Sequence, residues 1–239
     1  MSRRFEILAD PEAVAAATAD RLVAAGRNAI RRRGRFVVAL TGGSTPLAVC
    51  PLLVVPPRVR MLDWSRVEFF FGDERAVPPD HPESNYNTAR LALLDYLPRV
   101  RMEQVHRMPA DEDDLDAAAR GYEEELRTVI GGDPIPRLDL VWLGMGADGH
   151  TASLFPGSTA LEERERLVVA TWAPGPAAWR MTLTYPVLNA AREAMFVVTG
   201  ADKADALARV RDGTDPPPAA GVRAGRTLWL VDRAAAGTE

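Results

Sequence analysis

The sequence has few of the residues that form cross-links or bind metal ions. Cys50 is the only cysteine among 239 residues, which excludes an intramolecular disulfide and fits a reducing compartment. The three histidines are scattered, and together with this cysteine they show no metal-ligand spacing. We therefore expect a chain without a metal site.

Long apolar runs are also absent. No stretch approaches the roughly 18 apolar residues of a membrane span, and no apolar signal segment follows the basic residues at the start of the chain. A cytoplasmic protein without membrane contact is expected. The net charge of −4 argues against bulk electrostatic capture of nucleic acid, so an anionic ligand requires a local basic site.

Lysine is nearly missing, because Lys203 is the only lysine among 29 basic residues. One interpretation is a coding bias toward arginine in which a single lysine survived by chance. The other is that position 203 requires a compact ammonium group rather than a planar guanidinium. Composition alone leaves both interpretations open.

The apolar pattern predicts a sheet covered by helices. The first helix is expected from Asp10 to Arg33, and the first strand near Arg35. The alternation of strands and helices predicts an α/β protein with a mostly parallel sheet and helices on both faces. No linker divides the chain, so residues 1–239 are expected to form one domain. Strands are expected over residues 35–40, 67–71, 138–143, 167–171, 179–184, 194–199 and 227–231.

The chain is organised around residues 138–157, where an apolar strand runs into a glycine-rich loop. Asp148 and His150 lie two residues apart in that loop, where glycines let the backbone approach a ligand, so they suit an acid–base pair. The same glycines match the G-x-G-x-x-G dinucleotide fingerprint. The segment that follows contains Pro156 and Gly157 and lacks a helical pattern, so nucleotide binding is not favoured.

A second glycine-containing turn follows the first predicted strand. Gly42, Gly43, Ser44 and Thr45 connect that strand to a predicted helix. Free backbone N–H groups, hydroxyls and the positive end of the helix dipole make such a turn an anion site. The local chemistry favours phosphate binding over the alternative, a plain strand-to-helix connection.

Charged residues follow the strand predicted at residues 67–71. Asp73 and Arg75 lie where a parallel strand ends, and ligands of open α/β sheets bind at those carboxyl ends. A surface salt-bridge cluster is the alternative. Farther along the chain, the alternating strand at residues 179–184 presents Arg180 on the same face as two threonines.

Together these motifs resemble the glucosamine-6-phosphate isomerase/6-phosphogluconolactonase family, and within it the lactonases. The resemblance implies a Rossmann-like, doubly wound α/β fold. It also implies hydrolysis of 6-phospho-D-glucono-1,5-lactone to 6-phospho-D-gluconate in the pentose phosphate pathway, without a metal or organic cofactor. The implied ligand is the phosphosugar lactone, and a monomer or weak homodimer is expected. The matching segments, which cover nearly the whole chain in the family's order, are residues 40–46, 72–75, 84–86, 144–157, 180–184 and 200–204.

The resemblance implies catalytic roles for four residues. His150 is the implied general base, which takes a proton from the water that attacks the lactone carbonyl. Asp148 or Asp73 would orient its imidazole and stabilise the charged form, and the sequence leaves this choice open. Arg75 would contact the substrate or stabilise the developing oxyanion.

The resemblance also implies a phosphate site. The turn from Gly42 to Thr45 would bind the phosphate with its backbone, and Arg180 and Lys203 would supply positive charge. This agrees with the anion site that local chemistry predicts, and it favours a functional reason for the solitary lysine.

Two other functions compete with lactone hydrolysis. Amino sugar phosphate deaminases and isomerases of the family carry a glutamate five residues after the equivalent histidine and lack an arginine at the place of Arg75. This chain has Phe155 and Arg75 at those places. A non-catalytic sugar-phosphate sensor normally follows a DNA-binding helix-turn-helix, and a first strand near Arg35 leaves room for only one helix. Both differences favour the lactonase.

Overall fold

A six-stranded, fully parallel sheet forms the centre of the computed structural model, which describes residues 3–132, 134–173 and 177–238. The strand order is β1-β9-β8-β5-β2-β3. The predicted α/β class with a mostly parallel sheet is therefore confirmed. The strands are β1 (Arg3–Leu8), β2 (Phe36–Leu40), β3 (Val67–Phe71), β5 (Leu140–Leu143), β8 (Glu193–Val198) and β9 (Arg226–Asp232).

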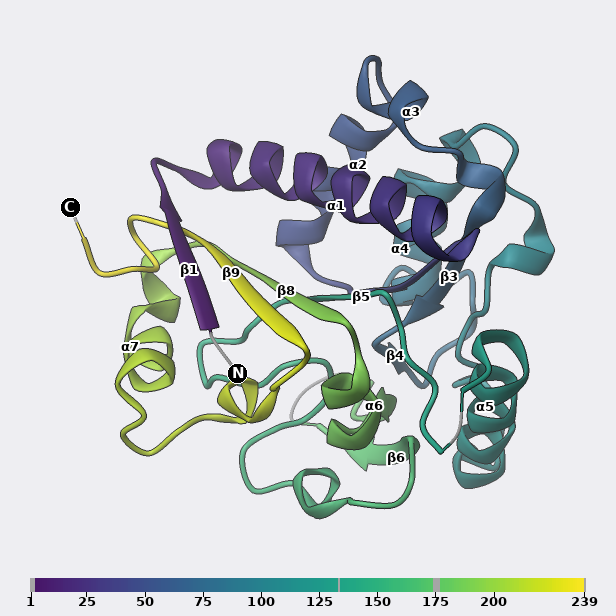
Figure 1. The fold of residues 1–239 in the computed structure, drawn as a ribbon. Coiled ribbons are helices and arrows are strands. Elements are labelled where there is room, and N and C mark those ends of the chain that lie inside the picture. The colour runs from purple at the N-terminus through teal and green to yellow at the C-terminus, as the bar shows by residue number, and fades with distance from the viewer. Residues whose placement is uncertain (1–2, 133, 174–176, 239) are drawn as a thin grey trace.

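Helices cover both faces of this sheet, with α1 to α4 on one side and α5 to α7 on the other (Figure 1). The α-helices are α1 (Pro11–Arg33), α2 (Ser44–Leu53), α3 (Arg58–Met61), α4 (Asn85–Ala92), α5 (Leu115–Ile130), α6 (Tyr185–Ala190) and α7 (Ala204–Asp212). Short 3-10 helices span Trp64–Arg66, Leu94–Tyr96, Met102–Gln104, Thr159–Glu162, Ala201–Lys203 and Pro218–Gly221. Among the described residues, no helix is long and apolar enough to cross a membrane.

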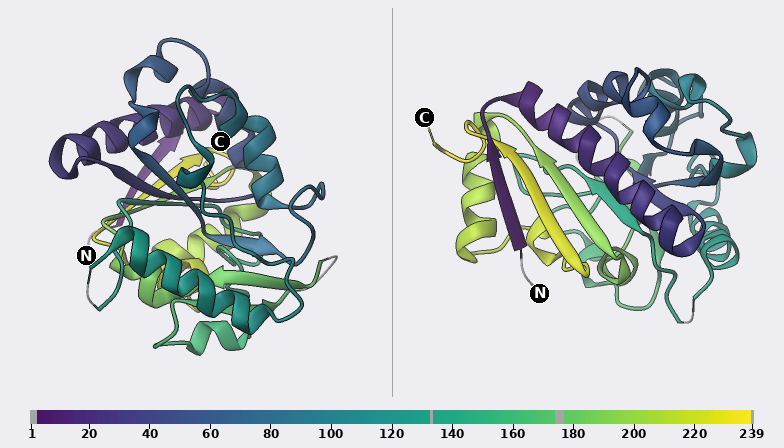
Figure 2. Two further views of the ribbon diagram at one scale, coloured as in Figure 1. Left: turned by 90° about the vertical axis from the view of Figure 1, so that its right-hand side faces the viewer. Right: turned by 45° about the horizontal axis from the view of Figure 1, so that its top comes forward.

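Local sequence sets both ends of α1. The carboxylate of Asp10 accepts the backbone N–H of Ala13 at 2.7 Å, and Pro11 occupies the first helical position. Such an N-cap contributes about 1 kcal/mol. At the other end, Gly34 has φ 80° and donates its N–H to the carbonyl of Ile30, a left-handed cap that glycine adopts without strain. These ends lie where the sequence predicts them. α1 connects β1 to β2 and runs across one face of the sheet (Figure 2).

β1 makes the prediction that the first strand lies near Arg35 wrong. Residues Arg3–Leu8 pair in parallel with β9, from Arg3 opposite Thr227 to Leu8 opposite Asp232. β1 lies at the edge of the sheet and none of its residues is fully buried. An edge strand of this kind lacks the continuous apolar run that marks a central parallel strand.

A separate three-stranded antiparallel sheet joins β4 (Asp73–Arg75), β7 (Trp179–Leu183) and β6 (Val168–Trp172) in the order β4-β7-β6. The sequence predicts two of these strands but does not assign them to a second sheet. In its register, Asp73 lies opposite Thr182 and Arg75 lies opposite Arg180. This small sheet brings charged residues from distant segments to one place.

The winding of the main sheet reverses between the adjacent strands β2 and β5. From β2 the chain continues to β3 on one side, and from β5 it continues to β8 and β9 on the other. Open α/β sheets bind ligands at the carboxyl ends of the strands at such a switch point. The loops that follow β2 and β5, which carry Gly42 and His150, therefore meet at one edge.

Candidate active site

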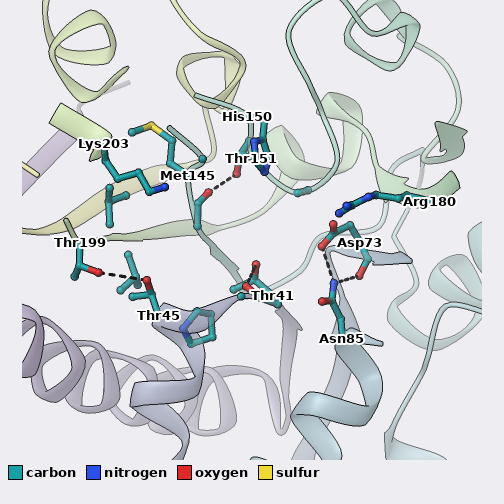
Figure 3. Close-up of a pocket in the computed structure, with 18 of the residues that line it drawn as sticks. Thr41, Thr45, Asp73, Asn85, Met145, His150, Thr151, Arg180, Thr199 and Lys203 are labelled. Atoms are coloured by element: carbon teal, nitrogen blue, oxygen red, sulfur yellow. Dashed lines mark hydrogen bonds between the residues drawn. The ribbon is translucent and has the colours of Figure 1, made fainter. Parts of the chain in front are cut away.

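A cavity of about 210 Å³ opens at the carboxyl ends of β2, β5 and β8 (Figure 3). Two of the site residues predicted from the sequence lie next to cavity-lining residues. Ser44 begins α2 directly after Gly43, and Asp148 contacts His150. The other sequence-predicted site residues all line the cavity: Gly42, Gly43, Thr45, Asp73, Arg75, His150, Arg180 and Lys203. Within the described part of the chain, no group of three or more His, Cys, Asp or Glu residues is arranged to hold a metal ion.

His150 and Asp148 form a hydrogen-bonded pair. Nδ1 of His150 lies 2.6 Å from Oδ1 of Asp148, and the same oxygen accepts the backbone N–H of His150 at 3.0 Å. Partial burial acts to raise the pKa of Asp148, but the backbone N–H and the ring of His150 outweigh it, so the pKa of this carboxyl is lowered. An ionised Asp148 accepts a hydrogen bond from the Nδ1–H of His150, and this tautomer leaves a lone pair on Nε2 of His150.

Gly146 makes room for this pair. A Cβ atom at position 146 would lie 2.2 Å from Nδ1 of His150 and 2.6 Å from Oδ1 of Asp148. The glycine-rich loop therefore accommodates the acid–base pair. Turns and an isolated bridge occupy residues 150–158, as the sequence predicts, so these glycines do not open the helix that a dinucleotide fingerprint requires.

Asp73 contacts the loop that carries His150 rather than the imidazole. Its side chain is buried, Oδ2 accepts the hydroxyl of Ser153 at 2.6 Å, and Oδ1 accepts Nδ2 of Asn85 at 3.1 Å. No hydrogen bond joins Asp73 to His150 among the described residues. Of the two acids that the sequence leaves open, Asp148 is the one beside the imidazole.

The three charged side chains of β4 point to opposite faces of the strand, because side chains alternate along a strand. Asp73 and Arg75 line the cavity, whereas the carboxylate of Glu74 accepts the backbone N–H groups of Asn85 and Tyr86, each at 2.8 Å, at the start of α4. Burial raises the pKa of Glu74, and these N–H groups act in the opposite direction. Two members of the predicted cluster thus face the cavity and the third caps a helix.

The turn after β2 presents an open backbone to the cavity. Gly43 has φ 101° and precedes α2, and no described side chain caps the first N–H groups of that helix. A Cβ atom at Gly42 would lie 1.8 Å from Oδ1 of Asn85, so any other residue there would displace the Asn85 side chain. The hydroxyl of Thr45 lies 3.3 Å from that of Thr199, which follows β8. This arrangement is typical of an anion site.

The cavity is cationic in a chain whose net charge is −4. Arg75, Arg180 and Lys203 line it, and Asp73 is the one carboxylate among its described lining residues. The Nε atoms of Arg75 and Arg180 are buried and have no hydrogen-bond partner among the described residues. Burial lowers the pKa of Arg180, and the charge of Asp73 opposes this change. Each unpaired buried donor costs about 1–3 kcal/mol, which a bound anion would relieve.

The cations approach the cavity from two sides. Figure 3 shows Lys203 near Thr45 and Thr199, and Arg180 beside Asp73, with His150 between them. Nζ of Lys203 also lies 2.8 Å from a carboxylate oxygen of Asp202. A ligand with one anionic group and one reactive carbon could therefore contact a cation and the imidazole at once.

Sequence reasoning gave no role to Asn85, Thr199 or Phe155. Thr199 follows the carboxyl end of β8, so the strand-end rule that selects Asp73 could also have found it. Asn85 joins Asp73 to the turn at Gly42, a contact that depends on tertiary structure. Phe155 stacks on His150, and no spacing rule signals that contact.

Comparison with known proteins gives one family. The sequence profile described as glucosamine-6-phosphate isomerases/6-phosphogluconolactonase matches residues 9–229. The 6-phosphogluconolactonase of Mycobacterium tuberculosis is 42% identical over 245 residues, which cover 99% of this chain and 98% of that protein. The solved 6-phosphogluconolactonase of Trypanosoma cruzi has a TM-score of 0.88 at 30% identity, with 99% and 96% of the two chains covered. A monomeric glucosamine-6-phosphate deaminase has a TM-score of 0.80 over 99% of this chain and 100% of its own, but its 19% identity shows the fold alone.

Proposed function

The chain belongs to the glucosamine-6-phosphate isomerase/6-phosphogluconolactonase family, and we propose that it hydrolyses 6-phospho-D-glucono-1,5-lactone to 6-phospho-D-gluconate with His150 as the general base. It is thus a hydrolase of the pentose phosphate pathway, like its relatives at 40–42% identity. The observation that carries the mechanism is the pair of His150 and Asp148, 2.6 Å apart, at a cavity lined by three cations.

The reaction opens an ester within the sugar ring. A water molecule attacks the carbonyl carbon C1, and Nε2 of His150 takes a proton from that water. Asp148 stabilises the imidazolium that forms, and it holds the ring in the tautomer that leaves Nε2 unprotonated beforehand. When the tetrahedral intermediate collapses, the bond from C1 to the ring oxygen breaks. His150 returns its proton to that oxygen, which becomes a hydroxyl group, and the carboxylic acid ionises at neutral pH.

Positive charge supports both ends of the substrate. The phosphate binds the free N–H groups of the turn from Gly42 to Thr45, with Lys203 and Arg180 as counter-charges. Arg75 stabilises the negative charge that develops on the carbonyl oxygen. These residues supply a base and fixed charges, so the steps use no metal ion or organic cofactor.

Three expectations from the sequence stay predictions: a cytoplasmic location, a monomer or weak homodimer, and a single domain over residues 1–239. No specific observation favours the amino sugar phosphate deaminase or the sugar-phosphate sensor.

The test is the hydrolysis of freshly generated lactone, measured as the excess over its spontaneous opening. His150→Ala is expected to lower kcat by about 10²–10⁴, the usual contribution of a general base, while 6-phospho-D-gluconate still binds in a calorimetric titration. Arg180→Ala is the matched variant, which should mainly raise KM because it removes a charge-assisted contact. A folded enzyme without excess hydrolysis, or a His150→Ala enzyme with full turnover, would overturn the proposal.

A further inference from the structure

One buried aromatic ring contacts both the base and a cation of the site. The rings of Phe155 and His150 are stacked, with centroids 4.1 Å apart and an interplanar angle of 23°. Cζ of Arg180 lies over the same Phe155 ring, 5.6 Å from its centroid. Phe155 is 8% exposed, so both contacts lie in a region that is shielded from water.

A tight turn brings Phe155 back onto His150. Thr151 and Leu154 form an isolated antiparallel bridge, and the N–H of Leu154 donates to the carbonyl of Thr151 at 2.9 Å. Ala152, within this turn, has φ 48°, in the left-handed region that residues other than glycine rarely adopt. Such a conformation costs about 1–3 kcal/mol and persists only where the surroundings impose it.

Three hydrogen bonds impose the turn. The hydroxyl of Thr151 donates to the carbonyl of Gly144 at 2.8 Å, at the end of β5. The hydroxyl of Ser153 donates to the carboxylate of Asp73 at 2.6 Å, and its backbone N–H donates to the hydroxyl of Thr182 at 3.1 Å. The turn is therefore tied to the main sheet and to both β4 and β7 of the small sheet, which fixes the stack of Phe155 on His150.

We propose that Phe155 is a positioning residue that couples the base to the substrate anion, because its ring orients the imidazole of His150 and the guanidinium of Arg180 together. The inference rests on the proposed function, since it concerns that reaction's base. The face of an aromatic ring is electrostatically negative, so it attracts a guanidinium and also the imidazolium that forms during attack.

The charges around His150 determine how much the Phe155 ring can contribute to stabilising the imidazolium. Asp148, on its own loop, and Asp73, on β4, favour a positive imidazole. The cations that line the cavity oppose it: Arg75 from β4, Arg180 from β7 and Lys203 at the start of α7. The Phe155 ring offsets part of this repulsion without adding a charge that would repel the substrate phosphate.

Two variants of the full-length enzyme separate the aromatic face from simple packing. Phe155→Leu keeps an apolar side chain but removes the ring, and Phe155→Tyr keeps the ring. Trp172→Leu is the matched control, because Trp172 is exposed, shares a neighbouring cavity with Phe155 and pairs with Trp179.

The first readout is proton NMR of the histidine rings, with the His150 signals assigned by their loss in His150→Ala. Their upfield ring-current shift should disappear in Phe155→Leu and persist in Phe155→Tyr and Trp172→Leu. A ring-current shift that survives in Phe155→Leu would overturn the proposal.

The second readout is lactone hydrolysis. Phe155→Leu should lower kcat between roughly 10- and 100-fold, as misplacement of a catalytic group does, and should also raise KM, whereas Phe155→Tyr should restore both. Equal losses in the two variants would indicate packing alone and overturn the proposal. Normal kinetics in Phe155→Leu would overturn it and leave the proposed function standing. If the unsubstituted enzyme does not hydrolyse the lactone, the proposed function fails first.

Discussion

Replacing Asp148 with asparagine is expected to lower kcat about tenfold while His150 keeps its position. Asparagine has the same size, and its side-chain oxygen still accepts the backbone N–H and the Nδ1–H of His150. The variant therefore removes the negative charge that stabilises the imidazolium and leaves the geometry in place.

The magnitude follows from the distance and the exposure of the pair. Two unit charges 4 Å apart interact by about 1 kcal/mol in bulk water and about 4 kcal/mol at the effective dielectric constant near a protein surface. Nδ1 of His150 and Oδ1 of Asp148 are 2.6 Å apart, but the Asp148 side chain is 46% exposed. Solvent screening therefore places the interaction near the lower figure, at about 1.4 kcal/mol, which is a factor of ten in rate.

The same charge affects the pH profile. The pKa of Asp148 is lowered despite its partial burial, so its carboxylate stays ionised over the whole range in which a histidine base titrates. Asp148→Asn removes a negative charge that favours the imidazolium, so the acidic limb of the kcat/KM profile should move to lower pH in this variant.

The assay follows acid release from lactone generated in the cuvette, with the spontaneous rate subtracted at each pH. Asp73→Asn is the matched control, since it makes the same chemical change in an acid that bonds Ser153 and Asn85. Asp73→Asn should lower kcat because it weakens the bond that holds Ser153 in the His150 loop. It should leave the acidic limb of the kcat/KM profile in place. An unchanged Asp148→Asn profile, together with a shifted limb in Asp73→Asn, would refute the assignment of Asp148.

Lys203→Arg is expected to raise KM for the lactone roughly tenfold, because the loss of a charge-assisted contact costs about 1.5 kcal/mol; unchanged steady-state constants would instead favour chance survival of the one lysine. Gly146→Ala should abolish most turnover, because the added Cβ would overlap the ring of His150, and circular dichroism should still show a folded chain. His106 lies between Glu125 at 2.7 Å and Glu68 at 3.2 Å. Burial acts to lower the pKa of His106, but the two carboxylates outweigh it and the pKa is raised. Its stabilisation is therefore complete below the unfolded value of about 6.5 and is lost as the pH rises through the folded value. Urea unfolding between pH 6 and pH 9 should show this loss, and His106→Gln should lack it.

Much of the main sheet and of the site could be predicted because its signals are local. An N-cap acid, a left-handed glycine and buried apolar runs set the ends of α1 and the central strands. The carboxyl ends of parallel strands share one edge, so the loops that carry Gly42 and His150 could be placed together.

The rest depends on contacts between distant segments. β4 consists of three charged residues, and only its pairing with β7, about a hundred residues later, makes it a strand. β1 is an edge strand in which three of the six residues are charged, so its sequence resembles an exposed segment. The choice between Asp148 and Asp73 rests on the direction of two side chains, which spacing does not determine.

The small sheet has a consequence for the folding of the enzyme. Its register sets Arg75 directly opposite Arg180, and like charges in that position destabilise a strand pair. An anion bound in the cavity neutralises this repulsion, so the ligand contributes to the local stability of β4 and β7. The amides of these strands should exchange with deuterium more slowly once phosphate is bound, while those of β5 and β8 change little. Substrate binding is therefore expected to stabilise the pairing of β4 with β7.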